Sequence, residues 1–97
     1  MANSGVGDSV LARVVMYGTR ACPYCDAARR LLLKKGSHYD DIRVDEHPEL
    51  RVEMRARGGG HTVPQIWINS RHIGGCDDLY ALEATGELDR LLAEDQA

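Results

Sequence analysis

The sequence lacks phenylalanine, has a single tryptophan among its 97 residues, and contains no apolar run long enough to cross a membrane. An aliphatic core can still form at this length, so one small domain can fold without disulfides or structural metals. The first nine residues have neither a basic start nor an apolar stretch, and nothing in them is typical of a secretory signal. We therefore expect a single cytoplasmic domain that does not associate with membranes.

Cysteine is also scarce, and charge is nearly balanced. Three cysteines cannot form a fully paired disulfide framework, and in a reducing compartment the expected uses of such thiols are catalysis or sensing. The net charge of −3 gives no support to nucleic-acid binding. Positive charge is nevertheless concentrated on Arg51, Arg55 and Arg57, which suits a small anionic ligand.

Two of the cysteines form the motif Cys22-Pro23-Tyr24-Cys25, directly after the strand-like run 14–17. Residues three apart on a helix lie about 5–6 Å from each other, so this pair can alternate between dithiol and disulfide with little backbone movement. Pro23 suits the first helical position, and the unpaired N–H groups there favour a thiolate on Cys22, the predicted nucleophile. Cys25 shares its helix face with core residues and is the predicted resolving thiol.

Zinc binding is the rival interpretation of this motif. Beyond it, the chain offers only Cys76 and four scattered histidines as further ligands of the usual kind. The sequence has no second Cys-x-x-Cys and no pair of histidines at zinc-finger spacing. The motif by itself favours redox chemistry and leaves the metal site open.

The apolar pattern predicts one α/β domain with the element order β-α-β-α-β-β-α-α. Strands are expected at 13–17, 39–44, 65–68 and 71–73, and helices at 22–35, from 48 to a glycine run, from 77 or 78 to 85, and at 88–92. The first helix would connect the first two strands in a right-handed βαβ unit. Residues 1–11 are expected to be a flexible arm that precedes the domain at 12–95.

Particular residues mark where these elements begin and end. Gly36 is expected to stop the first helix, and Gly86 separates the last two. Asp77 or Asp78 is expected to cap the helix that follows the hairpin. The run Gly58-Gly59-Gly60 ends the second helix and is interpreted as a flexible loop.

Three motifs together resemble the glutaredoxin family: Cys22-Pro23-Tyr24-Cys25, Thr62-Val63-Pro64 and Gly74-Gly75-Cys76-Asp77-Asp78. The resemblance is to the dithiol members of the bacterial glutaredoxin-3 group and covers roughly 13–92. It implies a thioredoxin-like fold with a four-stranded mixed sheet flanked by helices. It also implies glutathione-dependent reduction of protein–glutathione mixed disulfides and protein disulfides through Cys22 and Cys25.

The partners that the resemblance implies are glutathione, as co-substrate, and proteins that are glutathionylated or contain disulfides. Glutathione reductase would act indirectly, through glutathione. The resemblance implies no tightly bound cofactor, and we expect a monomer without a metal.

The resemblance further implies that Thr62, Val63 and Pro64 form one side of a glutathione site. Pro64 is cis in the family, which turns the Val63 backbone toward the active-site sulfur so that it can pair with the ligand like a strand edge. Tyr24 is expected to cover the sulfur.

A second side of this site would come from the glycine-rich motif. Gly75 lets the backbone approach a ligand, and the N–H groups of Cys76 and Asp77 would hold the γ-glutamyl carboxylate. Asp78 would meet the ammonium group of the same residue. The thiol of Cys76 is given no catalytic role.

The third part of the site is a carboxylate clamp. Arg51 would bind the glycyl carboxylate of glutathione through its guanidinium. Many family members carry lysine three residues before the first cysteine, but this chain has Thr19 there, followed by Arg20. We expect Arg20 to substitute only in part, so that the helix N-terminus contributes more of the stabilisation of the Cys22 thiolate.

Two other functions stay open. An iron–sulfur cluster could be shared by two chains, but in the family a proline at the position of Pro23 disfavours cluster assembly. The second is a thioredoxin-type protein-disulfide reductase, which is itself reduced by a reductase enzyme and not by glutathione. Both Tyr24 and the motif 74–78 count against it.

Overall fold

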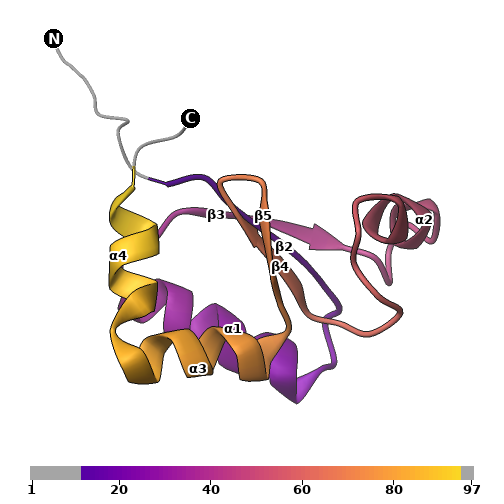
Figure 1. The fold of residues 1–97 in the computed structure, drawn as a ribbon. Coiled ribbons are helices and arrows are strands. Elements are labelled where there is room, and N and C mark those ends of the chain that lie inside the picture. Colours follow the sequence, from indigo (N-terminus) through magenta and orange to yellow (C-terminus); the bar gives the residue numbers. More distant parts are fainter. Residues whose placement is uncertain (1–11, 95–97) are drawn as a thin grey trace, which may run out of the picture.

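The computed structural model describes residues 12–94, so the expected arm at 1–11 lies outside the described residues. The elements follow the predicted order (Figure 1). They are β2 (Val14–Gly18), α1 (Pro23–Lys34), β3 (Tyr39–Arg43), α2 (Glu49–Ala56), β4 (Gln65–Ile68), β5 (Arg71–Gly74), α3 (Cys76–Thr85) and α4 (Glu87–Ala93). None of the helices within 12–94 is both long enough and apolar enough to span a bilayer.

The four strands form one mixed sheet in the order β3-β2-β4-β5. β2 and β3 are parallel, with α1 between them in the chain, which confirms the predicted βαβ unit. β4 runs antiparallel to both β2 and β5. The tight hairpin between β4 and β5 turns at Asn69 and Ser70, which both have positive φ, at 51° and 68°, as a two-residue turn of this hand requires.

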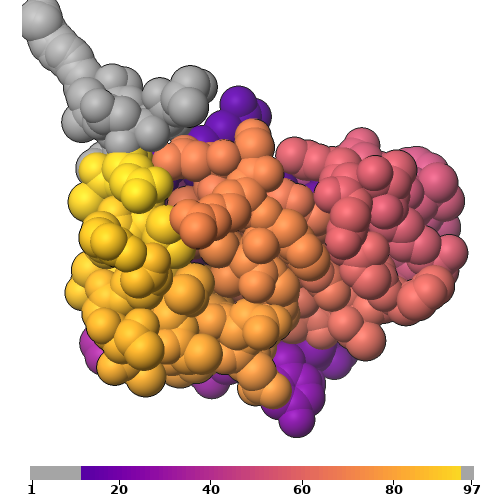
Figure 2. Space-filling model, viewed as in Figure 1, coloured from indigo at the N-terminus to yellow at the C-terminus, as the bar shows by residue number. Residues whose placement is uncertain are grey.

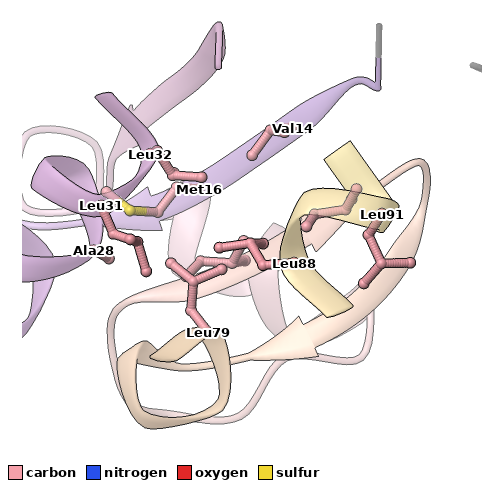
Figure 3. Packing of buried hydrophobic residues seen from close by; sticks show 10 residues of the cluster. Val14, Met16, Ala28, Leu31, Leu32, Leu79, Leu88 and Leu91 are labelled. Atoms are coloured by element: carbon pink, nitrogen blue, oxygen red, sulfur yellow. The ribbon is translucent and has the colours of Figure 1, made fainter. Parts of the chain in front are cut away.

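The central strands β2 and β4 are buried along their whole length because both faces of the sheet are covered. Alternate side chains therefore enter two different cores. Val14 and Met16 point into the larger core beneath α1, α3 and α4 (Figure 3). Tyr17 and Trp67 belong to the smaller core, where Met54 of α2 packs against them.

The helices divide the molecule into two unequal parts. Figure 1 shows α1, α3 and α4 together and α2 at the other end of the sheet. The space-filling view keeps this separation, with the yellow and orange C-terminal helices at one end and the pink α2 segment at the other (Figure 2).

The predicted cap of α3 was wrong by two or three residues. Gly75 is the N-cap, and the helix begins at Cys76. Asp78 is the third helical residue, and its Oδ2 accepts a hydrogen bond of 2.9 Å from the backbone N–H of Gly75. A carboxylate at this position can reach back over the first turn, so an acidic pair there does not identify which residue starts the helix.

The glycine run after α2 is packed at one point, although the sequence suggested only a flexible loop. The N–H of Gly59 donates a 3.0 Å hydrogen bond to the carbonyl of Met54. A Cβ atom on Gly59 would lie 3.0 Å from both that carbonyl oxygen and the ring of Trp67. Glycine is needed here because the chain leaves the helix in contact with the smaller core.

The larger core should supply much of the stability of the fold. Leu88 of α4 is fully buried in it, so Leu88→Ala should lower the free energy of unfolding by about 2–5 kcal/mol in urea denaturation. Leu33 of α1 is 65% exposed, and Leu33→Ala should change it by less than about 0.5 kcal/mol. Equal losses for the two variants would contradict this assignment of the core.

Candidate active site

The position of Cys22 follows from the short connection between β2 and α1. Cys22 is the N-cap of α1, with extended backbone angles of φ −130° and ψ 112°, and Pro23 follows in the first turn. The Sγ atom of Cys22 accepts a hydrogen bond of 3.4 Å from the N–H of Cys25. A sulfur atom thus takes the role that a serine or aspartate oxygen usually has at a helix N-terminus.

Cys25 lies one turn further along and is fully buried. Its Sγ packs against the end of β2, where a Cβ atom on Gly18 would come within 3.1 Å of it. The resolving thiol predicted from the helix periodicity is therefore covered by core and backbone, whereas Cys22 stays partly exposed.

The two thiols differ in acidity. Burial acts to raise the pKa of Cys22, but hydrogen bonds from the N–H groups of Cys25 and Tyr24, from the Cys25 thiol and from the Thr19 hydroxyl outweigh it. The net pKa of Cys22 is lower than that of an ordinary cysteine. Negative charge is stabilised at this helix end, which is what a thiolate nucleophile requires.

Cys25 shows the opposite shift. Burial raises the pKa of Cys25 to about 11, and the neighbouring Cys22 adds to the rise. A hydrogen bond from the Thr19 backbone and the charge of Arg29 act in the other direction. Of the two sulfurs, Cys22 therefore loses its proton more readily, and Cys25 stays a thiol near neutral pH.

The segment 62–64 lies opposite the nucleophile. The Val63–Pro64 peptide bond is cis, as the resemblance implies. The carbonyl oxygen of Val63 lies 4.0 Å from the Sγ atom of Cys22. The backbone of this segment is thus placed where a molecule attached to Cys22 would pass along it.

A groove of about 480 Å³ runs beside this segment, a size typical of small-molecule sites. Most of the residues predicted to bind glutathione line it, namely Tyr24, Thr62, Val63, Pro64, Gly75, Cys76, Asp77 and Asp78. Two motifs that are ten residues apart in the sequence therefore meet around one cavity. The structure shows that these residues line the groove, and that they bind glutathione stays a prediction.

Glycine is required where β5 passes into α3. Gly74 has φ +119°, and a Cβ atom there would lie 2.2 Å from Oδ2 of Asp78. A Cβ atom on Gly75 would lie 3.3 Å from the carbonyl oxygen of Pro64. The two glycines bring the start of α3 against the cis-proline segment, which closes the groove on that side.

The two arginines predicted to bind glutathione lie outside the residues that line the groove. Arg20 is tied to the loop after β3, because its backbone N–H donates to Asp45 and its guanidinium lies 3.4 Å from Glu46. Arg51 reaches toward the site, with Nη1 3.5 Å from the carbonyl oxygen of His61. Of the two, only Arg51 points at the segment that carries Thr62.

Sequence reasoning missed a polar pair in the wall of the groove. Gln65 is buried, and its Nε2 donates to the carbonyl and hydroxyl oxygens of Thr62 at 3.0 and 3.2 Å. Its Oε1 lies 2.7 Å from Nε2 of His72 on β5. The available signal was a glutamine in an otherwise apolar strand directly after Pro64.

Cys76 also lines the groove, but its thiol is poorly suited to act as a nucleophile. Its side chain is buried, and burial raises the pKa of the thiol, with further contributions from the charges of Asp77 and Cys22. A thiol of this kind is a poor nucleophile.

The rival zinc interpretation finds no support in the described part of the chain. Within residues 12–94, no three histidine, cysteine, aspartate or glutamate side chains come together as a possible metal site.

Comparison with known proteins agrees with the three motifs. The glutaredoxin family model matches residues 14–73. The chain is 54% identical over 80 residues to a glutaredoxin of Pseudomonas aeruginosa, covering 82% of this chain and 95% of the relative. It is 50% identical over 82 residues to glutaredoxin 3 of Escherichia coli K12, covering 84% and 99%.

Solved structures give the same answer. A glutaredoxin from Brucella melitensis superposes with a TM-score of 0.76 at 49% identity, covering 90% of this chain and 95% of that one. A buckwheat glutaredoxin in complex with glutathione also gives 0.76, at 28% identity, covering 81% and 74%. The fold is thioredoxin-like, and the chain belongs to the glutaredoxin family, whose members are glutathione-dependent thiol–disulfide oxidoreductases.

Proposed function

We propose that this glutaredoxin reduces protein–glutathione mixed disulfides and protein disulfides, with Cys22 as the nucleophile and Cys25 as the resolving thiol. One observation carries the proposal. The lowered pKa of Cys22 and the raised pKa of Cys25 occur three residues apart, and the sulfur of Cys22 lies 4.0 Å from the carbonyl oxygen of Val63, which lines a groove of suitable size for a tripeptide. Paired thiols of opposite acidity are suited to the two successive roles.

In the first step, the Cys22 thiolate attacks the glutathionyl sulfur of a mixed disulfide. The substrate protein leaves as a thiolate that takes up a proton, and glutathione stays bonded to Cys22. A second glutathione thiolate then attacks the glutathionyl sulfur on Cys22, which restores the Cys22 thiolate and releases glutathione disulfide. Cys25 takes no part in this route.

With a protein disulfide, the intermediate carries the substrate on Cys22. Cys25 loses its proton to solvent and attacks the sulfur of Cys22, which forms the Cys22–Cys25 disulfide and releases the second substrate thiolate. Two glutathione molecules then reduce this disulfide. Proximity of the two sulfurs favours the ring closure over attack by a free thiol.

Glutathione is proposed to lie along the groove from Cys22 to the start of α3. Its cysteinyl residue would pair with the Val63 backbone, which faces the Cys22 sulfur. Its γ-glutamyl group would meet the N–H groups of Cys76 and Asp77 and the carboxylate of Asp78. The buckwheat glutaredoxin solved with glutathione supports a tripeptide site on this fold.

The partners are proposed to be glutathione and glutathionylated or disulfide-containing proteins, and glutathione reductase would regenerate the reductant. Action as a monomer in the cytoplasm is part of the same proposal. Glutaredoxin potentials of about −200 to −230 mV lie close to the glutathione poise of that compartment. Glutathione can therefore serve as the electron donor.

The first test is turnover of a glutathionylated peptide by wild type, Cys22→Ser and Cys25→Ser, with glutathione reductase and NADPH consumption as the readout. Cys22→Ser should lose activity completely because no thiolate remains at the helix N-terminus. Cys25→Ser should retain it because the first route needs a single thiol. If the wild type is inactive with glutathione, the proposal is wrong, and a thioredoxin-type or cluster-binding role becomes the better interpretation.

The acidity of Cys22 should depend on Thr19. In wild type, the rate of alkylation by iodoacetamide should rise with pH through a midpoint below that of an ordinary cysteine. Thr19→Val keeps the shape but removes the hydroxyl hydrogen bond to the thiolate, so the midpoint should move to higher pH. Thr85→Val, at the end of α3, is the matched control and should leave the profile unchanged. If the midpoint in Thr19→Val equals that of wild type, the Thr19 hydroxyl does not stabilise the Cys22 thiolate.

The carboxylate clamp can be tested on α2. Arg51→Gln should raise the KM for glutathione about two- to fivefold with kcat nearly unchanged, because an exposed charge pair is worth about 0.5–1 kcal/mol. Arg55→Gln removes the same charge one turn further along the helix and should have a smaller effect. Equal effects would indicate a general electrostatic attraction of glutathione and no specific clamp.

A further inference from the structure

Arg29 is an unusually enclosed cation for a residue on a surface helix. Its side chain is only 12% exposed. The guanidinium contacts Asp41 through Nε at 3.1 Å and Nη2 at 3.3 Å, and Asp26 through Nη1 at 2.9 Å. Arginine loses much hydration in such a place, so its position is fixed by these two carboxylates.

The guanidinium lies beneath the active site. A Cβ atom on Gly18 would lie 3.1 Å from the Sγ atom of Cys25 and 3.2 Å from Nη2 of Arg29. The sulfur and the cation therefore flank the same point, at the place where β2 has no side chain. A larger residue than glycine would push them apart.

Arg29 is also bonded to a residue that contacts both sulfurs. Its Nη2 donates a 3.1 Å hydrogen bond to the carbonyl oxygen of Thr19. The backbone N–H of Thr19 lowers the pKa of Cys25, and its hydroxyl lowers the pKa of Cys22, each by acting as a hydrogen-bond donor toward the sulfur. The connection between β2 and α1 is thus fixed from below by one guanidinium.

We propose that Arg29 is a positioning residue for the ring-closing step, in which it favours the Cys25 thiolate and holds the backbone of Thr19 against the sulfur of Cys25. The inference rests on the proposed role of Cys25 as the resolving thiol. It concerns the dithiol route alone, because the monothiol route needs no charge on Cys25.

The chemistry explains why a cation is useful at this point. Cys25 must give its proton to solvent before its sulfur can bond to that of Cys22 and expel the thiolate held there. The groups that face Cys25 are Cys22, Thr19 and Arg29. Arg29 is the cation among them, and Asp26 and Asp41 offset part of its charge.

The size of the effect can be bounded. A full opposite charge at close range typically shifts a pKa by about 1–3 units, and the two carboxylates place Arg29 at the lower end, at about one unit. Losing it would reduce the Cys25 thiolate about tenfold. The remaining thiolate becomes about threefold more nucleophilic, so the ring-closing rate should fall about threefold.

The experiment follows ring closure in a single turnover. Reduced full-length protein is mixed with glutathione disulfide at pH 6–8, quenched in acid, and analysed by mass spectrometry for loss of the Cys22–glutathione adduct. Arg29→Gln should close about threefold more slowly than wild type at each pH. Arg29→Lys should recover most of the rate, since it keeps the charge. Arg30→Gln, the neighbouring exposed arginine, should match wild type.

Turnover of a glutathionylated peptide supplies the second readout. In Arg29→Gln this turnover should stay close to the wild-type rate, because the first route uses only the Cys22 thiolate. A variant that distorted the whole site would lose this activity together with ring closure. Normal ring closure in Arg29→Gln, or no recovery in Arg29→Lys, would overturn the inference. If Cys25→Ser also lost the adduct, the resolving role of Cys25 would itself be wrong, which separates the two failures.

Discussion

The structure depends on the sulfur of Cys22 being the cap of α1. Because β2 ends at Gly18 and α1 begins at Pro23, the strand delivers Cys22 directly to the unpaired N–H groups of the helix. Those N–H groups have no partner within the helix, and the sulfur of Cys22 accepts a hydrogen bond from one of them, the N–H of Cys25. The same contact that completes the helix also stabilises negative charge on the nucleophile. Stability and reactivity therefore share one interaction here.

The second half of the site results from packing at the opposite side of the sulfur. Gly74 and Gly75 let the start of α3 approach the segment that carries Val63 and Pro64, and Gln65 ties this segment to β5. The groove is thus formed by backbone that is held on both flanks. Such a surface can bind an extended peptide by main-chain hydrogen bonds, which suits a ligand shared by many substrates.

The sequence was sufficient to predict features that depend on local chemistry or on spacing along the chain. The element order, the buried side of α1 and the active-site motif were all accessible because helix periodicity and turn residues are local signals. Contacts made through space were not accessible. Thr19 was interpreted only as a missing lysine, and Gln65 and Arg29 received no role, since their partners are brought to them by the sheet. The cap at Gly75 was missed because Asp78 satisfies it from inside the helix.

The opposite acidity of the two thiols also has a thermodynamic consequence. Stabilising the Cys22 thiolate favours the reduced form of the pair, because the disulfide has no charge for the helix end to stabilise. A buried Cys25 with a high pKa adds no such stabilisation near neutral pH. One favoured thiolate raises the potential of the pair above that of two ordinary thiols, which makes the disulfide easier for glutathione to reduce. Arg29 fits this arrangement because it can assist the transient thiolate on Cys25 without making that thiolate the resting state.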